Sequence, residues 1–166
     1  MDFEKNDETD KGKKYTHCGV PMMLFLLLFY TISIVFMVIF WANELFYILL
    51  PTTVFFLFGI LNTYNITITV NNTYFSFKLG VGLIKKRYKI VNIKSCKPYS
   101  GISKRIGIGS KLSITGNVLN YYIVTGFKSI EIQFHDRKTV VHIGTPLPEE
   151  ISQYIQLLID GNKNIQ

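Results

Sequence analysis

The stretch VPMMLFLLLFYTISIVFMVIFW (residues 20–41), the break ANE (42–44) and the stretch LFYILLPTTVFFLFGILNTY (45–64) decide the fold of this chain. The only charged residue between positions 20 and 64 is Glu44, which lies in the break. An α-helix needs about 20 apolar residues to cross a hydrocarbon core about 30 Å thick, and both stretches have that length. Because the break is so short, we predict a transmembrane hairpin with helices over 20–41 and 45–64 and an external turn at 42–44.

A secretory signal peptide is the alternative reading of the first stretch. That stretch is longer than the roughly 7–15 apolar residues of a signal, and Trp41-Ala42-Asn43-Glu44 does not resemble a small-residue cleavage site. A second apolar stretch follows at once. We therefore expect the hairpin to be retained.

Positive charges near the ends of membrane helices stay on the cytoplasmic side. Lys11, Lys13 and Lys14 precede the first helix, Lys78 and later cations follow the second, and the turn has no Lys or Arg. We predict that both termini are cytoplasmic, with residues 1–19 forming a tail and residues 65–166 forming a domain.

The two helices contain no Lys, Arg, His or Asp, and the polar side chains within the spans are hydroxyls, whereas pumps and proton relays need ionisable groups at membrane depth. These hydroxyl residues are Tyr30, Thr31, Ser33, Tyr47, Thr52 and Thr53. The hairpin is therefore predicted to be an anchor. An accessory subunit of a larger membrane complex is the alternative, because small residues that line one helix face favour packing on partner helices. The residues that bear on this alternative are Ser33, Thr52, Thr53 and Gly59.

After position 64 the apolar residues alternate with polar ones, which is typical of half-buried strands. In residues 83–90, for example, Lys85, Arg87 and Lys89 alternate with Ile84, Lys86 and Tyr88. We predict an α+β membrane protein whose domain is a small antiparallel β-barrel or sandwich of about seven strands. Eight segments are candidates for these strands: 67–70, 73–79, 83–90, 91–96, 105–108, 120–124, 128–134 and 138–143.

The end of the chain has the pattern of one amphipathic helix. Pro148 suits the first turn, and Glu149 and Glu150 lie where the helix dipole favours acids. Ile151, Tyr154, Ile155 and Leu158 form one apolar stripe. This helix is expected to pack across an open end of the barrel.

Several short motifs resemble a known family. They are Gly107-Ile108-Gly109, Val124-Thr125-Gly126, Ile130-Glu131-Ile132, and Ile143-Gly144-Thr145 followed by Pro148-Glu149-Glu150. The chain resembles small bacterial membrane proteins in which a pleckstrin-homology-like (PH-like) domain follows a transmembrane hairpin. The turn His135-Asp136-Arg137 departs from the Gly-containing turn usual there. The resemblance implies a PH-like fold held at the inner membrane, and it implies no particular chemistry.

No catalytic motif is evident in the sequence. The three histidines are scattered, with His17 in the tail, His135 in a turn and His142 expected on a strand surface, and Cys18 and Cys96 form no metal or redox motif. We expect a protein that is not an enzyme, with no cofactor and no bound metal.

Basic charge is concentrated in the domain, which contains fourteen Lys and Arg residues and five acidic residues. The chain as a whole has a net charge of +7. Cations close to an anionic leaflet contribute about 1 kcal/mol each. We predict that this surface binds anionic lipid headgroups, although a plain solvated strand face fits the same pattern. The residues predicted to form it are Lys85, Lys86, Arg87, Lys104 and Arg105.

Nucleic acid is not expected as a partner, because Arg is scarce and no recognition element is evident. The expected partners are the lipid bilayer and, under the alternative reading, a membrane protein. The sequence therefore predicts a binding or scaffolding domain at the cytoplasmic surface of the inner membrane.

Overall fold

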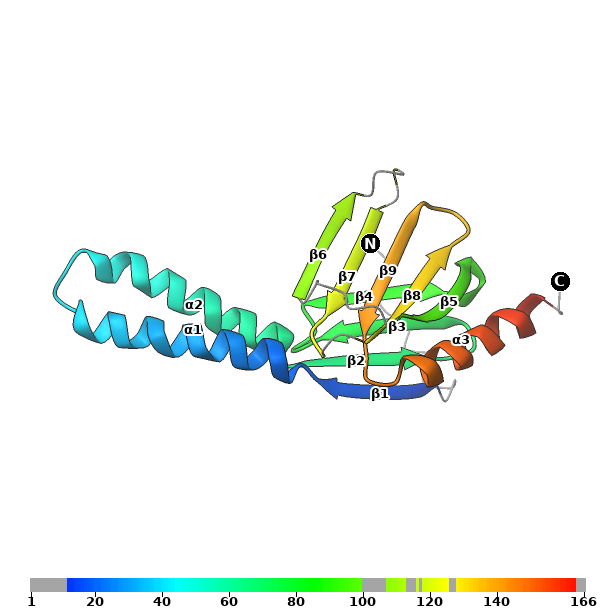
Figure 1. Ribbon diagram of the computed structural model, residues 1–166, viewed down its shortest axis with the longest axis horizontal. Helices are drawn as coiled ribbons and strands as arrows, with labels where there is room; N and C mark the ends of the chain where they lie inside the picture. The colour runs from blue at the N-terminus through cyan, green and yellow to red at the C-terminus, as the bar shows by residue number, and fades with distance from the viewer. Residues whose placement is uncertain (1–11, 100–106, 113–115, 117, 126–127, 164–166) are drawn as a thin grey trace.

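The computed structural model of the chain describes residues 12–99, 107–112, 116, 118–125 and 128–163. Within these residues, a helical hairpin extends from one end of a domain built from two sheets and a C-terminal helix (Figure 1). The protein is therefore elongated, with the apolar hairpin at one end and the C-terminal helix on the domain.

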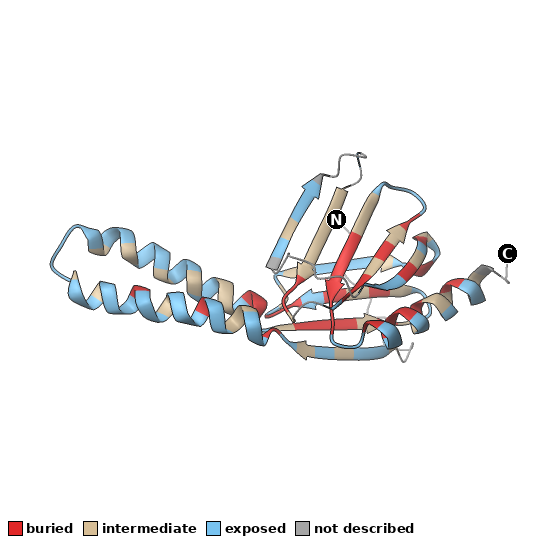
Figure 2. Cartoon of the chain, viewed as in Figure 1, coloured by how far each residue is buried: buried red, intermediate tan, exposed pale blue. Residues whose placement is uncertain are grey.

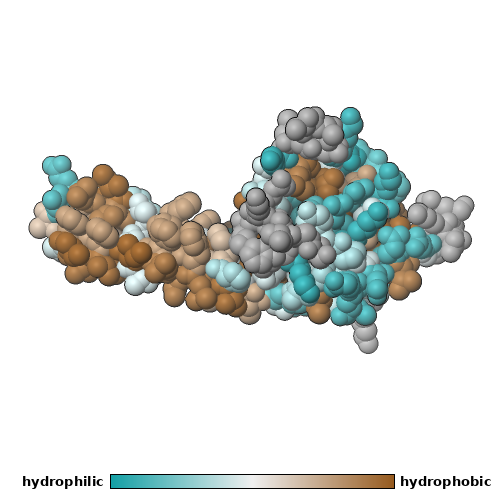
Figure 3. All heavy atoms as spheres, in the orientation of Figure 1, coloured by the Kyte–Doolittle hydropathy of each residue, from teal (hydrophilic) through white to brown (hydrophobic). Residues whose placement is uncertain are grey.

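The hairpin consists of α1 (Val20–Ile39) and α2 (Leu45–Thr63). Both helices are long and apolar enough to cross a membrane. Most of their side chains are exposed (Figure 2), and apolar residues make up most of the visible surface of the hairpin (Figure 3). A soluble protein would bury such helices in its core, so this exposed apolar surface favours a membrane environment.

The first sheet has the strand order β1-β2-β3-β4, and all of its pairs are antiparallel. Its inner face buries alternate residues of β2 and β3, among them Ile68, Phe75 and Phe77. The strands are β1 (Lys13–Cys18), β2 (Asn65–Val70), β3 (Tyr74–Leu79) and β4 (Ile84–Lys89).

The expectation that residues 1–19 form only a tail is wrong for β1. This strand precedes the hairpin in sequence, yet it pairs with β2, which follows the hairpin, and Cys18 lies opposite Asn65. The antiparallel hairpin returns the chain to the point where it left the domain, so the two strands meet. The sheet domain therefore includes residues on both sides of the hairpin.

The second sheet has the strand order β5-β8-β9-β7-β6. β7 and β9 pair in parallel, so the expected all-antiparallel arrangement is wrong at this pair. The described residues form nine strands rather than about seven. A short 3₁₀ helix, η1 (Ile90–Asn92), links the sheets, and the strands are β5 (Ile93–Tyr99), β6 (Gly107–Leu112), β7 (Val118–Ile123), β8 (Ser129–Phe134) and β9 (Thr139–Gly144).

The core lies between the two sheets, whose strands cross steeply in Figure 1. Helix α3 (Pro148–Lys163) packs mainly on β5 and buries Ile151, Ile155 and Ile159 in the same core. Tyr154 and Leu158 pack against its edge. The predicted amphipathic helix is thus confirmed, with Ile159 extending its apolar stripe.

The hairpin joins the domain without a linker. Only Gly19 separates β1 from α1, and only Tyr64 separates α2 from β2. The Gly19 N–H donates to the Tyr64 carbonyl at 2.8 Å, which continues the β1–β2 ladder to the base of the helices. A Cβ at position 19 would collide with the Thr63 carbonyl and lie 3.0 Å from that of Val124, so a side chain does not fit here. The strands of the first sheet therefore leave the hairpin in a defined direction (Figure 1).

Candidate functional site

The outer face of the first sheet is strongly basic. Residues directly opposite each other on neighbouring strands share a face, and on this face Lys78 lies opposite Lys85 while Ser76 lies opposite Arg87. The four strands contain no Asp or Glu in their sequence. We define the basic face as Lys14, Lys78, Lys85, Arg87 and Lys89, all exposed.

One cation of the basic face is held in place by an aromatic ring. The Arg87 guanidinium carbon lies 3.9 Å from the centre of the Tyr74 ring, which is the geometry of a cation–π contact. Tyr74 in turn lies opposite Lys89. The far part of β4 is therefore an ordered cationic surface.

The structure brings three of the five predicted site residues together on β4, which is an edge strand. Lys85 and Arg87 lie on the basic face, as their alternation predicted. Lys86 lies opposite the buried Phe77, but its own side chain is exposed, because among the described residues no strand follows β4 in the sheet. Lys104 and Arg105 lie outside the described residues.

Sequence reasoning missed Lys14 and Lys78 as members of this surface. Lys14 was assigned to a tail, and only its pairing with Thr69 places it in the same cross-strand row as Arg87. The polar side of residues 73–79 included Lys78, but its partner on the next strand depends on register. The pairing Lys78–Lys85 is thus a result of the fold.

The turn between β3 and β4 contacts the end of α2. The Val81 N–H donates to the Leu61 carbonyl at 3.1 Å, and the Gly80 N–H donates to the Asn65 carbonyl at 2.8 Å. Gly80 has φ +48°, and a Cβ there would collide with the Leu61 carbonyl and Asn62. The turn exposes two apolar side chains beside the helix, Val81 (57% exposed) and Leu83 (62%).

The basic residues lie at graded distances from the hairpin. A strand rises about 3.3 Å per residue, so Arg87 lies about 7 Å and Lys89 about 13 Å farther along β4 than Lys85. Lys78 and Lys85 are therefore the two cations of the basic face nearest the helices.

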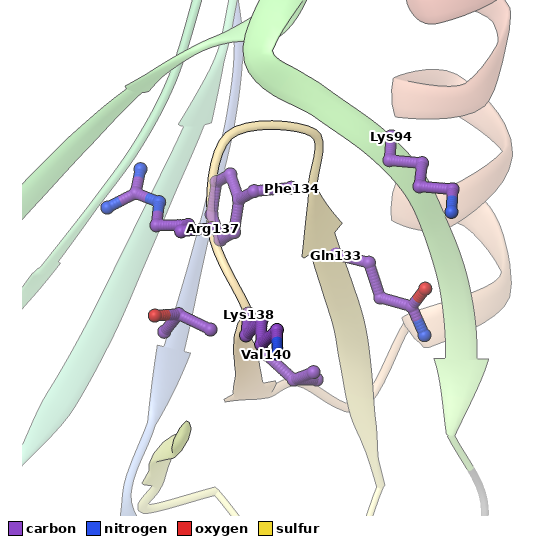
Figure 4. Close-up of a pocket in the computed structure, with 7 residues that line it drawn as sticks. Lys94, Gln133, Phe134, Arg137, Lys138 and Val140 are labelled. Atoms are coloured by element: carbon purple, nitrogen blue, oxygen red, sulfur yellow. The ribbon is translucent and has the colours of Figure 1, made fainter. Parts of the chain in front are cut away.

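A shallow depression near the β8–β9 turn is also lined by cations (Figure 4). Its volume of about 150 Å³ is below the roughly 300–1,000 Å³ of typical ligand pockets. The Arg137 guanidinium lies 4.2 Å from the centre of the Phe134 ring and 3.5 Å from the Asp136 carboxylate. Figure 4 shows the Lys94 side chain directed away from Arg137. These cations do not converge on one ligand position, so the depression is not a convincing anion site.

A histidine–carboxylate pair lies on the outer face of the second sheet. His142 Nε2 lies 3.1 Å from Glu131 Oε2, the Tyr99 ring packs edge-on against the imidazole, and Gln133 donates to Glu131 at 2.8 Å. His142 is only 8% exposed, so the expectation of a surface histidine is wrong, because neighbouring side chains cover it. This arrangement satisfies buried polar groups of a sheet.

The nearby thiol is unsuited to nucleophilic chemistry. Burial and, to a lesser degree, the charge of Glu131 raise the pKa of Cys96 to about 12, so the thiol stays protonated. Among the described residues, no three His, Cys, Asp or Glu side chains are placed to hold a metal ion.

Comparison of the chain with protein-family models, with curated proteins and with solved structures found no match.

Proposed function

We propose that this chain is a non-enzymatic membrane protein whose hairpin spans the bilayer and whose basic, PH-like domain serves as a binding or scaffolding module at the cytoplasmic surface. The observation that carries the proposal is the joint, where Gly19 bonds to Tyr64 and both helices continue directly into β1 and β2. A domain attached in this way cannot leave the membrane surface or rotate freely over it.

The β1–β2 pairing also supports the proposed topology. The strand before the hairpin and the strand after it belong to one sheet, so both ends of the hairpin lie on the same side. The positive charge on that side and its absence from the turn favour the cytoplasm for both termini. The two sheets around one core and the C-terminal helix are compatible with a PH-like domain, whereas the parallel β7–β9 pair is a departure from it.

The basic face supplies the proposed interaction with anionic lipid. Exposed charges are screened over about 8 Å at physiological ionic strength, so cations near the hairpin feel the leaflet most strongly. Of the three outward-facing cations on β4, Lys85 lies nearest the hairpin, and Arg87 and Lys89 follow about 7 Å and about 13 Å farther along the strand. The proposal therefore assigns the attraction mainly to the end of the basic face nearest the bilayer.

The alternative function is an accessory subunit whose hairpin packs on partner helices. The small and hydroxyl residues that would favour it make contacts inside the hairpin: the Ser33 and Thr53 hydroxyls are hydrogen-bonded across it, and Gly59 faces Leu26. Thr52 donates to the Ile48 carbonyl of its own helix at 2.9 Å. These contacts favour a self-contained anchor.

Lysine acetylation followed by mass spectrometry tests the proposed lipid contact. The full chain is placed in nanodiscs of neutral lipid or of lipid with an anionic fraction, and the reaction rate of each lysine is compared. We expect Lys85 to react severalfold more slowly on anionic lipid, with the difference lost in high salt. Lys94, exposed on β5, and Lys138, exposed in the β8–β9 turn, are internal controls. Equal rates for Lys85 on both lipids would overturn the lipid-binding role.

Purification of the full chain in mild detergent separates the two candidate functions. A stoichiometric partner retained through Ser33→Leu and Gly59→Leu but lost on changes to lipid-facing residues such as Phe55→Ala would favour the accessory subunit. A chain recovered without a stoichiometric partner favours the anchor with a binding domain.

A further inference from the structure

The β3–β4 turn lies at the depth where α2 leaves the proposed bilayer. The carbonyl that accepts the Val81 N–H belongs to Leu61, two residues before the last residue of the helix. Tyr64, which follows the helix, is an aromatic residue of the kind enriched at membrane–water interfaces. The backbone of the turn is therefore held beside the interfacial end of the helix.

The side chains of this turn are apolar and exposed. Val81 and Leu83 leave more than half of their surface uncovered. Val91 in η1 is equally exposed at 57%, but it follows β4, at the end of the strand away from the hairpin. Val81 differs from Val91 in that its backbone is hydrogen-bonded to the end of α2.

Two like charges flank the turn. Lys78 and Lys85 lie directly opposite each other on the outer face, and like charges in such a position repel. No acidic residue is present on the four strands to separate them. A phosphate group between the two ammonium groups would remove the repulsion, and a lipid headgroup supplies a phosphate at this depth.

We propose that the β3–β4 turn is a third membrane contact, in addition to α1 and α2. In this contact Val81 and Leu83 enter the interfacial layer beside α2, while Lys78 and Lys85 hold the phosphate of an anionic lipid. This inference rests on the proposed function insofar as it requires an inserted hairpin. It adds a definite site and ligand class, and it fixes which edge of the domain faces the bilayer.

The single tryptophan of the chain makes the contact measurable. In a Trp41→Phe background, Val81→Trp and Val91→Trp form a matched pair of equally exposed positions. The variants are placed in nanodiscs of lipid brominated near the headgroup end of the acyl chains, and quenching of the fluorescence is recorded. We expect severalfold stronger quenching and a bluer emission for Val81→Trp than for Val91→Trp.

The unmodified chain tells the two hypotheses apart. Trp41, 74% exposed at the hairpin turn, reports insertion of the hairpin in the same nanodiscs. Absence of Trp41 quenching would contradict the proposed function itself. Quenching of Trp41 together with equal, weak quenching of Val81→Trp and Val91→Trp would overturn only the third contact.

A charge-changing pair tests the phosphate clamp. We expect Val81→Trp to be quenched more strongly in anionic than in neutral nanodiscs. In this background Lys78→Gln/Lys85→Gln should abolish the additional quenching, whereas Lys94→Gln/Lys138→Gln should retain it. Unchanged thermal unfolding of both double variants shows that the fold is intact. Equal behaviour of the two double variants would overturn the clamp, and loss of the additional quenching on adding inorganic phosphate would identify free phosphate as the ligand instead.

Discussion

Gly80 is a single residue at which the first sheet packs closely against the end of α2. Its positive φ already favours glycine, and the Leu61 carbonyl occupies the space that a side chain would need. Gly82, with φ +99° in the same turn, has open space around its Cβ position. Substitution of Gly82 would therefore introduce backbone strain alone, whereas substitution of Gly80 would introduce backbone strain and a steric collision.

We expect Gly82→Ala to cost about 1–3 kcal/mol of stability through backbone strain alone. Gly80→Ala should cost at least about 2 kcal/mol more, because the helix end and the turn must move apart as well. Chemical unfolding of the full chain in detergent micelles measures both. Equal losses for the two variants would show that the close approach is not energetically important.

Tyr15 ties the N-terminal strand to the C-terminal helix. Its hydroxyl donates to Glu150 Oε1 at 3.0 Å, and nearby the Lys13 ammonium lies 4.6 Å from the centre of the Tyr154 ring. Burial, followed by the hydrogen bond and charge of Glu150, raises the pKa of Tyr15 from 10.0 to about 12. The folded protein therefore favours the protonated phenol.

This shift predicts a defined alkaline effect. The contribution of the Tyr15 hydroxyl to stability is fully present below pH 10.0 and is lost as the pH rises through about 12. The stability difference between the wild type and Tyr15→Phe should accordingly shrink across this window. Tyr88 and Tyr122, whose pKa values burial also raises, are present in both proteins and cancel in the difference. A difference independent of pH would contradict the prediction.

Alternation along the chain predicted the face on which single side chains lie, and it failed where a neighbour came from elsewhere. It placed Lys85 and Arg87 correctly on an outer face, because a strand directs successive side chains to opposite sides. It could not place Lys14 beside Thr69, since that contact depends on a partner beyond the hairpin. His142 was misplaced for the same reason: Glu131 and Tyr99 cover it from other strands.

At the scale of elements, β1 is the least predictable strand. Its sequence, KKYTHC, lacks the apolar alternation that marks the strands of the domain. The strand exists because the hairpin brings β2 back to it, and the parallel β7–β9 pair is equally non-local. The amphipathic α3, whose apolar stripe is local, was predicted from sequence with little error.

Removing β1 should leave an open edge on the sheet. Residues 65–166 alone expose the unpaired backbone of β2, and such edges promote association. We expect this fragment to associate, whereas a version with residues 13–18 joined to Asn65 through an Asn-Gly turn should be monomeric, because Cys18 and Asn65 are already opposite each other. Light scattering after size-exclusion chromatography measures both. Two monomers of equal stability would show that β1 is dispensable.

At the scale of the whole molecule, the apolar stretches predicted the hairpin, and the sheet adds that both of its ends lie on one side. Single cysteines at positions 5, 44 and 166, in a chain with Cys18→Ser and Cys96→Ala, test the orientation. An impermeant thiol reagent should label position 44 in intact cells and leave positions 5 and 166 unlabelled until the cells are opened. Labelling of 5 and 166 with protection of 44 would reverse the proposed topology.

If the hairpin spans the bilayer as proposed, the β1–β2 pairing also has a consequence for biogenesis. Translation at about 5–20 residues per second completes β1 several seconds before β2 emerges, because residues 19–64 must be synthesised in between. During this interval β1 has no partner, and the sheet closes only when the second helix has returned the chain to the same compartment. A ribosome product whose hairpin inserts incorrectly leaves two unpaired strand edges on opposite sides of the bilayer. Faulty insertion and faulty folding thus become one event, visible to the proteases that survey nascent chains.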